Sequence, residues 1–393
     1  MRHISLGYLN ISQKGKEYVN DALNSNRLSR GKYTNLFETE FAALHGCKHA
    51  IFMNSGTSAL QVSLAALKEV YGYQDGDEVI VPAMTFIATS NVVIQNNLKP
   101  VFVDVDYETF NISPVHIREA ITEKTRAIIP AHLFGLPADM NFISLIAKSY
   151  GLQVLEDSCE TILATTGSRE TGFAPVGSFG DLACFSMYVN HLITGGVGGL
   201  VTTNDDQLAD ICRSLMAHGR NPSYLSIDDD DNTNNLQTIM ERRYQFDRIG
   251  YSYRATELEA AIALSELENC QSNIATRQSN ASLLTYLLKD VDFLQLPRIP
   301  PNTEHVFMMY PMVLEDKLDR DAFLLYLERN GIETRYLLPL LSQPVYRRMF
   351  PREESRHPVA RRLSERGFFI GVHQGLTTED IQYIADAIKA YQR

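Results

Sequence analysis

The segment Ser186-Met-Tyr-Val-Asn-His191-Leu-Ile-Thr-Gly195-Gly-Val-Gly-Gly199 lies between two short apolar runs, residues 183–186 and 199–203. The glycines at its end predict a loop in which the backbone can closely approach a ligand. His191 stands inside this loop. An imidazole can move protons near neutral pH, although a buried histidine is more often a structural residue with its hydrogen bonds satisfied. The composition of the loop favours the functional interpretation.

The first half of the chain alternates short apolar runs with helical patterns, which predicts an α/β fold with a mostly parallel sheet. The predicted strands are residues 49–53, 78–81, 100–105, 127–131, 153–156, 183–186 and 199–203. The predicted helices are residues 58–71, 90–95, 114–120, 140–150, 206–216 and 256–267. Ser58 and Thr256 are the expected N-caps, and Glu259 completes a capping box with Thr256.

The pattern changes near residue 273, toward a long helix followed by short strands and helices. Because 393 residues exceed the usual size of one hydrophobic core, we expect two domains. The large domain should span residues 1–270, and a smaller C-terminal α+β domain residues 271–393. The polar segment 221–235, with aspartates at 228–231, predicts a mobile surface loop, since such runs are usually solvated.

Whole-chain properties narrow the class of protein. A net charge of -11 without a basic cluster argues against nucleic acid and anionic membrane surfaces as partners. The cysteines at 47, 159, 184, 212 and 270 lack zinc or iron–sulfur spacing, so we expect no metal site and no disulfide. The N-terminus lacks the apolar core of a signal peptide, and no apolar run approaches a membrane span. We therefore expect a cytoplasmic protein.

Three further motifs could contribute to a site for a phosphate-bearing ligand, although each also has an ordinary structural explanation. Residues 54–60 join a strand to a helix through small residues, where backbone N–H groups can approach a phosphate; a simple capped turn is equally common. Residues 155–160 end a strand in carboxylates, and Asp157 would need a cationic partner such as a protonated pyridine nitrogen. Arg248 and Arg254 bracket two tyrosines and could bind phosphate or form surface ion pairs.

Together these segments resemble the DegT/DnrJ/StrS family of sugar aminotransferases, a branch of the fold-type I enzymes that depend on pyridoxal phosphate (PLP). The resemblance covers nearly the whole chain, through residues 31–41, 54–60, 81–89, 132–139, 156–157, 177–181, 250–257 and 331–335. It implies an aspartate aminotransferase-like fold. It also implies a homodimer in which each active site receives the 250–254 loop of the neighbouring subunit.

The resemblance assigns roles to individual positions. Gly56, Thr57 and Ser186 would hold the cofactor phosphate, Phe86 would stack on the ring, and Asp157 would pair with the ring nitrogen. Glu160 stands where the family often has glutamine, Ser252 replaces the usual asparagine of a phosphate contact, and Val197 replaces a common glutamate. The expected substrate-binding residues are Arg220, Arg248, Arg254 and Arg335.

His191 occupies the position of the family's catalytic lysine, which forms a Schiff base with PLP. An imidazole cannot form that bond, and no lysine occurs between Lys148 and Lys289. Histidine at this position resembles the nucleotide-sugar 3-dehydratases, such as GDP-4-keto-6-deoxy-D-mannose 3-dehydratase. The E-D-x-C-E stretch at 156–160 and the histidine–glutamine pair at 373–374 fit the same branch. The scattered cysteines do not fit its iron–sulfur relatives.

The resemblance therefore implies deoxysugar biosynthesis. Pyridoxamine phosphate (PMP), held without a covalent bond, would act on a nucleotide-linked 4-keto-6-deoxy sugar. His191 would be the acid–base group in the loss of the C3 hydroxyl, and L-glutamate would regenerate PMP. Two alternatives remain open: an aminotransferase with an atypical mechanism, and a non-catalytic homologue that binds the cofactor or a nucleotide sugar.

Overall fold

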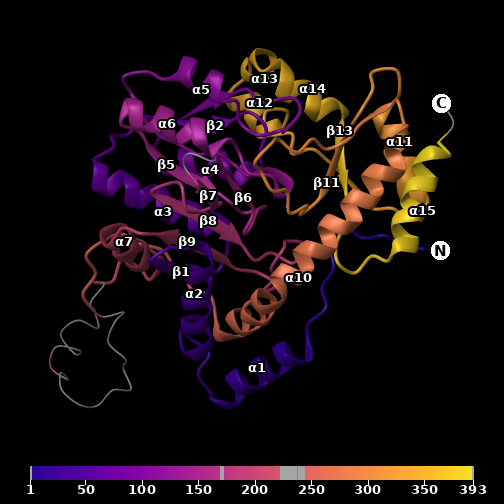
Figure 1. The fold of residues 1–393 in the computed structure, drawn as a ribbon. Coiled ribbons are helices and arrows are strands. Elements are labelled where there is room, and N and C mark those ends of the chain that lie inside the picture. The colour runs from indigo at the N-terminus through magenta and orange to yellow at the C-terminus, as the bar shows by residue number, and fades with distance from the viewer. Residues whose placement is uncertain (1, 169–171, 222–236, 238–243, 392–393) are drawn as a thin grey trace.

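Seven strands form the central sheet of the computed structural model, in the order β1-β9-β8-β5-β4-β2-β3 (Figure 1). The structure describes residues 2–168, 172–221, 237 and 244–391, so residues 222–235 of the predicted polar loop lie outside the described residues. The strands are β1 (His49–Met53), β2 (Glu78–Pro82), β3 (Lys99–Val103), β4 (Thr125–Ile128), β5 (Gln153–Asp157), β8 (Leu182–Ser186) and β9 (Gly199–Thr203).

The direction of these strands brings several loops to one edge. β9 runs antiparallel to both β1 and β8, whereas β2, β3, β4, β5 and β8 pair in parallel. The predicted mostly parallel sheet is confirmed, and every predicted strand belongs to it. Because β1 and β8 both oppose β9, the carboxyl ends of β1, β5 and β8 lie at the same edge, where ligands of open α/β sheets bind.

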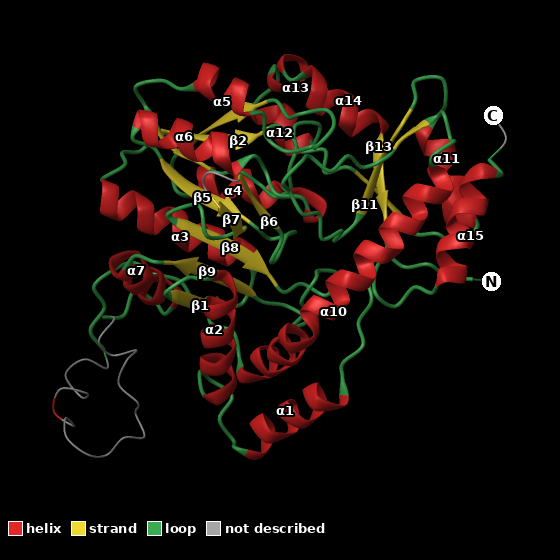
Figure 2. Cartoon of the chain, viewed as in Figure 1, coloured by secondary structure: helices red, strands yellow, loops and turns green. Residues whose placement is uncertain are grey.

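Helices cover both faces of this sheet (Figure 2). Alternate residues of β2 explain why both faces are covered, since Val79 and Val81 belong to one hydrophobic core and Ile80 to another. α3 packs against β8 and β9 on the first face, and α6 packs against β5 on the other. The helices of this part are α1 (Gln13–Asn24), α2 (Lys32–His45), α3 (Gly56–Tyr71), α4 (Ile87–Gln95), α5 (Pro114–Ala120), α6 (Met140–Tyr150) and α7 (Asp206–Met216), with a short 3-10 helix, η1 (Leu133–Gly135).

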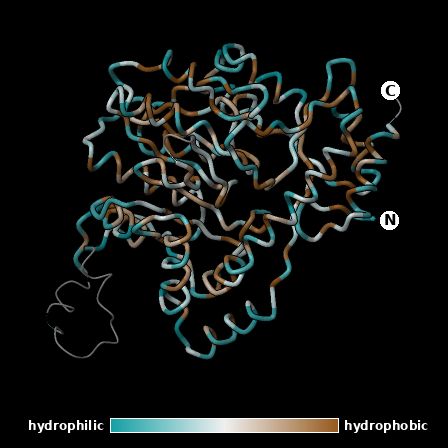
Figure 3. Tube along the Cα trace, in the orientation of Figure 1, coloured by the Kyte–Doolittle hydropathy of each residue, from teal (hydrophilic) through white to brown (hydrophobic). Residues whose placement is uncertain are grey.

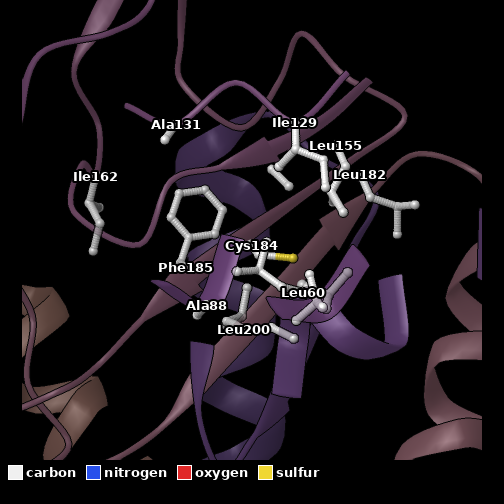
Figure 4. Close-up of a cluster of buried hydrophobic side chains, with 14 of the residues drawn as sticks. Leu60, Ala88, Ile129, Ala131, Leu155, Ile162, Leu182, Cys184, Phe185 and Leu200 are labelled. Atoms are coloured by element: carbon white, nitrogen blue, oxygen red, sulfur yellow. The ribbon is translucent and has the colours of Figure 1, made fainter. Parts of the chain in front are cut away.

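The core between α3 and the sheet lies directly behind the predicted ligand edge. Leu60 of α3 clusters with Leu155 of β5, Cys184 of β8 and Leu200 of β9, and all four side chains are buried (Figure 4). Figure 3 shows the same distribution over the chain, with hydrophobic residues gathered inside and hydrophilic residues along outer elements such as α1. Burying this much apolar surface keeps the edge residues on a rigid base.

Two helix starts test the capping predictions. Thr256 caps α10 (Glu257–Leu288) as predicted, and Glu259 completes the capping box. The prediction for α3 was wrong, because the helix begins at Gly56 and its N-cap is Ser55. The Ser55 hydroxyl accepts a hydrogen bond from the backbone N–H of Ser58 at 3.0 Å, so Ser58 lies inside the first turn. The sequence N-S-G-T-S contains two serines that suit an N-cap, and the earlier one is used.

The C-terminal part forms a second, antiparallel sheet in the order β10-β11-β13-β12. Its strands are β10 (Leu294–Gln295), β11 (Tyr310–Leu314), β12 (Thr334–Tyr336) and β13 (Gly367–Ile370). Its helices are α11 (Arg320–Arg329), α12 (Pro344–Met349), α13 (Glu353–Arg356), α14 (Pro358–Arg366) and α15 (Thr378–Lys389). α10 passes residue 270 without a break and packs against both α1 and α15, so the domain boundary at that residue stays a prediction.

Several elements of the structure are missing from the predicted set, among them α1, α2 and a small separate sheet. β6 (Thr165–Ser168) and β7 (Gly172–Pro175) form a separate two-stranded antiparallel sheet. Neither strand has the apolar run from which the other strands are predicted. In the part of the chain that the structure describes, no helix has both the length and the apolar character that crossing a membrane requires.

Candidate active site

A cavity of about 520 Å³ opens at the edge where β1, β5 and β8 end. Its volume lies in the range of small-molecule sites. Predicted site residues from four separate segments and from β12 come together on its walls: Gly56, Thr57, Phe86, Asp157, Glu160, Ser186, His191 and Arg335. Val197, which replaces the family's glutamate, also lines the cavity. No lysine is found among the described residues of this lining.

The start of α3 provides a close backbone approach to the cavity. A Cβ atom on Gly56 would lie 2.7 Å from Cys159 Sγ and 2.9 Å from Ser186 Cβ, so only glycine fits there. Gly199 has the same constraint, since its Cβ would lie 2.1 Å from the Ser55 carbonyl oxygen. The glycine loop before β9 therefore packs directly against the helix start. The free N–H groups and dipole of that helix favour a bound phosphate.

Asp157 ends β5 with a buried carboxylate at the base of the cavity. The Thr89 hydroxyl donates a hydrogen bond to Oδ2 at 2.6 Å, and the Cys159 backbone N–H donates to Oδ1 at 3.2 Å. The Thr89 hydroxyl lies 2.9 Å from that of Thr85. Because an ionised carboxylate has about four acceptor positions, these donors leave it able to bind a cation in the cavity. Such a buried charge requires a partner of opposite sign.

The neighbouring Glu156 points to the opposite side of β5 and has a different role. Its carboxylate accepts hydrogen bonds from the backbone N–H groups of Gly177, Phe179 and Gly180 at 2.7–2.8 Å. It also pairs with Nε2 of His132 at 3.0 Å. With all of these donors, Glu156 organises the turn before β8 and is not available to a ligand.

His191 faces the cavity from the loop after β8. Its Nδ1 lies 3.2 Å from the Ser186 carbonyl oxygen, which can only accept a hydrogen bond. Nδ1 therefore carries the proton of the neutral ring, and Nε2 keeps a lone pair. Burial, the largest cause, and the positive charge of Arg277 together lower the pKa of His191 to about 4, against the opposing effects of the Ser186 and Cys159 backbones. The imidazole is thus neutral at pH 7 and able to accept a proton.

Glu160 is the second acid in the cavity. Its Oε2 accepts a hydrogen bond from the Phe134 backbone N–H at 2.9 Å. Burial raises the pKa of Glu160 to about 7, and the nearby Asp157 carboxylate contributes in the same direction. A raised pKa of this size is typical of a carboxyl group that can act as an acid near neutral pH.

The raised pKa predicts a pH-dependent effect of Glu160→Gln on stability. The folded state holds its extra proton between the unfolded pKa of 4.5 and about pH 7, so stability decreases as the pH rises through this window. Glutamine keeps the acceptor for Phe134 but carries no charge. We expect the variant to be more stable than the parent at pH 8 by about 1–3 kcal/mol and equally stable at pH 4.5, since one pKa unit corresponds to about 1.4 kcal/mol. Thermal melts at both pH values, with the exposed Glu40→Gln as control, measure this; equal melts at pH 8 would contradict it.

Phe86 and Arg335 both line the cavity. Phe86 is the N-cap residue of α4 and is 57% exposed, which leaves its ring accessible to a flat ligand. The Arg335 guanidinium pairs with Glu333 at 2.6 Å and donates to the Thr334 carbonyl at 2.7 Å. Its remaining donors suit an anionic or hydroxyl-bearing ligand.

The other predicted residues lie outside the cavity of this chain. Arg248 forms an ion pair with Glu69 at 2.7 Å, and Arg254 contacts the ring of His218 at 3.2 Å. Arg220 lies over the ring of Phe246 at 5.6 Å, and Ser252 lies within 3.4 Å of Arg254. The contribution of the 250–254 loop to a neighbouring subunit's site stays a prediction.

Two residues that support the site were not predicted. Thr89 orients Asp157 and ends the segment 81–89, so that segment contained a signal for it. Arg277 is buried inside α10 and donates from Nη1 to the carbonyl oxygen of Met308 at 2.9 Å. Met308 lines the cavity, so Arg277 holds part of its wall. A single arginine within a long helix gives no local signal of this role.

Comparison with known proteins identifies relatives over the full length. A profile of the DegT/DnrJ/EryC1/StrS aminotransferase family matches residues 10–389. GDP-perosamine synthase of Escherichia coli O157:H7 is 34% identical over 393 residues, which cover 100% of this chain and 99% of that protein. dTDP-4-dehydro-2,6-dideoxy-D-glucose 3-dehydratase of Saccharopolyspora spinosa is 33% identical over 386 residues, covering 93% of this chain and 81% of that protein.

A solved structure has the same fold. GDP-4-keto-6-deoxy-D-mannose-3-dehydratase of E. coli, with bound hydrated PLP, superposes with a TM-score of 0.88 at 26% identity, and the match covers 99% of this chain and 100% of that one. The predicted fold-type I architecture is thereby confirmed, and the predicted PLP-type cofactor is confirmed for the family. The matched length and the shared architecture establish that the chain belongs to the DegT/DnrJ/EryC1/StrS aminotransferase family.

Proposed function

We propose that the protein is a nucleotide-sugar 3-dehydratase that uses non-covalently bound PMP to remove the C3 hydroxyl of a 4-keto-6-deoxy hexose. The observation that carries the proposal is His191, whose Nε2 keeps its lone pair in a cavity with no lysine among its described lining residues. An amine that could attach the cofactor covalently is therefore missing where the family has one. A group that can transfer protons takes its place.

The residues of the cavity fit a PLP-type cofactor. The close backbone approach at Gly56, together with Thr57 and Ser186, suits the phosphate, and Asp157 suits a protonated ring nitrogen. The exposed ring of Phe86 offers a stacking surface. When bound, such a cofactor supplies an electron-accepting ring that stabilises negative charge developing next to the reacting carbon.

The chain's own residues then perform the proton transfers. Nε2 of His191 accepts a proton, while Nδ1 holds the ring in place through the Ser186 carbonyl. A bound phosphate would raise the pKa of His191 toward the working pH, since nearby negative charge favours the imidazolium. The protonated His191 can then deliver its proton to the departing C3 hydroxyl. The Asp157 carboxylate, oriented by the hydrogen bond from Thr89, would pair with a protonated ring nitrogen.

Relatives support both this reaction and a second candidate. Two of the proteins named above are 3-dehydratases by name: the E. coli protein with bound hydrated PLP and the S. spinosa protein. The name of the E. coli protein gives a GDP-linked sugar as its substrate. The second candidate is amino transfer to the same class of sugar, which the 34% identity to GDP-perosamine synthase favours. On either proposal the substrate is a nucleotide-linked 4-keto-6-deoxy sugar, and the GDP-linked form is the first substrate to test. L-glutamate as amine donor and a homodimer with shared sites belong to the same proposal.

Product analysis tests this function. The purified protein is incubated with PMP, L-glutamate and GDP-4-keto-6-deoxymannose, followed by dTDP-, CDP- and UDP-linked analogues, and the sugar products are measured by mass spectrometry. We expect a product that has lost the C3 hydroxyl. Gain of an amine would establish the second candidate instead, and unchanged sugars would favour a binding protein. Treatment of the PLP-loaded protein with borohydride should give no lysine adduct, and such an adduct would contradict non-covalent binding.

A further inference from the structure

The N-terminal strap, defined as Ile4–Tyr8, fastens to the C-terminal part of the chain. The Ile4 backbone N–H donates to the Gly331 carbonyl at 2.7 Å, and its carbonyl accepts from the Glu333 N–H at 2.9 Å. The Ile4 side chain is buried in the C-terminal core, and the Leu6 N–H donates to the Glu333 carboxylate at 3.0 Å. Figure 1 shows this segment (indigo) leading from the C-terminal side of the molecule to α1.

The same strap touches the loop that carries His191. A Cβ atom on Gly7 would lie 2.6 Å from Oδ1 and 2.9 Å from Cα of Asn190, so the two backbones meet with no room for a side chain. Leu6 and Asn190 both line the cavity beside His191. The strap thus connects the C-terminal part to the loop after β8, and its residue Leu6 forms part of the cavity wall.

Asn190 has the chemistry to recognise a sugar. Its side-chain amide offers two donors and an acceptor, the combination that pairs with hydroxyl and keto groups. Among the residues that the structure describes, none forms a hydrogen bond with this amide. An amide that lines a cavity and makes no bond within the protein is available to a ligand.

We propose that the strap is a specificity-determining wall, in which Gly7 positions the Asn190 amide to bind a hydroxyl group of the sugar ring next to His191. This inference rests on the proposed function, because it takes the sugar of that reaction as the ligand. Gly7 is a positioning residue that acts through Asn190. A side chain at position 7 would push Asn190 away from its place, and the amide would no longer meet the sugar.

The strap also contacts Glu333, which pairs with Arg335, a second polar residue that lines the cavity. One oxygen of the Glu333 carboxylate accepts a hydrogen bond from the Leu6 N–H, and the other accepts one from the Arg335 guanidinium. The position of Arg335 in the cavity is thus tied to the strap through a shared carboxylate. Because both polar groups depend on the same five residues, a change in the strap should alter recognition of the sugar and leave the cofactor contacts at Gly56 and Asp157 unchanged.

Gly7→Ala tests the inference in the full-length protein. We expect KM for GDP-4-keto-6-deoxymannose to rise about tenfold or more, because small misplacements of a positioning group are costly. The dissociation constant of PLP, measured by absorbance, should stay within twofold of the parent. The control is Leu9→Ala, next to the strap and 47% exposed, which should leave KM unchanged. An unchanged KM in Gly7→Ala would overturn the inference.

A double-mutant cycle separates positioning from general damage. If Gly7 acts through Asn190, then Gly7→Ala should add little to the loss already caused by Asn190→Ala. Fully additive losses would show that Gly7 has no such role. If Gly7→Ala fails to fold, Asn190→Ala alone still decides, because an unchanged affinity for the sugar in that variant excludes its amide as a contact.

A binding measurement keeps this test distinct from that of the proposed function. Calorimetry on the PLP-loaded protein gives dissociation constants for GDP-4-keto-6-deoxymannose and for its 3-deoxy counterpart without requiring turnover. We expect the parent to prefer the 3-hydroxy sugar and Gly7→Ala to lose most of that preference. If the parent shows no dehydration but Gly7→Ala loses the preference for the 3-hydroxy sugar, the proposed function is wrong and the inference about the strap is supported. An equal preference in parent and variant would contradict the inference about the strap and leave the proposed function unaffected.

Discussion

Replacing His191 by asparagine is expected to stop the elimination and to leave the cofactor bound. The asparagine amide can still donate to the Ser186 carbonyl, as Nδ1 of the imidazole does at 3.2 Å. It offers no basic nitrogen in place of Nε2. Loss of a positioned acid–base group typically lowers the rate by about 10²–10⁴-fold, so we expect kcat for dehydration to decrease by that factor. The measurement is the rate of 3-deoxy product formation with saturating PMP and sugar.

The pH profile identifies the group that is lost. The bound phosphate raises the pKa of His191 above the value of about 4 that it has in the free protein, so kcat/KM of the parent, measured with saturating PMP, should be level at high pH and should decrease as the pH falls through that raised pKa. The variant should lack this acidic limb. His116→Asn, on the exposed surface of α5, is the matched control and should retain full activity. Unchanged turnover in His191→Asn would exclude the imidazole as the proton-transfer group.

The parts of this site that could be predicted are those that lie next to strand ends. Asp157 ends a short apolar strand, His191 and Gly56 lie in the segments that follow two others, and strands of the same direction place their carboxyl ends at one edge. Local patterns identify such strands because each is nearly all apolar and buried on both faces. The motif order then indicated the family, and with it the roles of these residues. The structure brings all three residues to one cavity.

The parts that could not be predicted depend on contacts between distant segments. Arg277 reaches the cavity wall only because α10 passes behind it, and Gly7 meets Asn190 only because the N-terminus crosses to the loop after β8. No periodicity or composition signals such contacts. The pairing of Arg248 with Glu69 is of the same kind, since the sequence allowed both a phosphate contact and a surface ion pair. Side chains that act through tertiary neighbours need the structure.

Asp157→Asn tests the other half of the mechanism, the charge that faces the cofactor ring. Asparagine has nearly the same shape and can keep the hydrogen bond from Thr89, but it cannot neutralise a protonated ring nitrogen. Breaking a buried ion pair costs about 3–5 kcal/mol. We therefore expect the affinity for PLP to decrease by on the order of 10²-fold or more, with a loss of kcat that persists at saturating cofactor. Absorbance titration with PLP and product analysis at high PMP measure the two effects.

Glu160→Gln is the matched control for this change, because it removes the other carboxyl group of the same cavity. Because the pKa of Glu160 is raised to about 7, this carboxyl group keeps its proton in a large share of the molecules at neutral pH. Its replacement by an uncharged amide should therefore alter cofactor affinity far less than Asp157→Asn. Equal losses in the two variants would show that general electrostatics of the cavity, and not a specific contact of Asp157, holds the cofactor. An unaltered affinity for PLP in Asp157→Asn would contradict the proposed pairing of this carboxylate with the cofactor ring. The contribution of Asp157 to a charged ring would then be lost from the mechanism. The proton transfers by His191 alone would not support elimination.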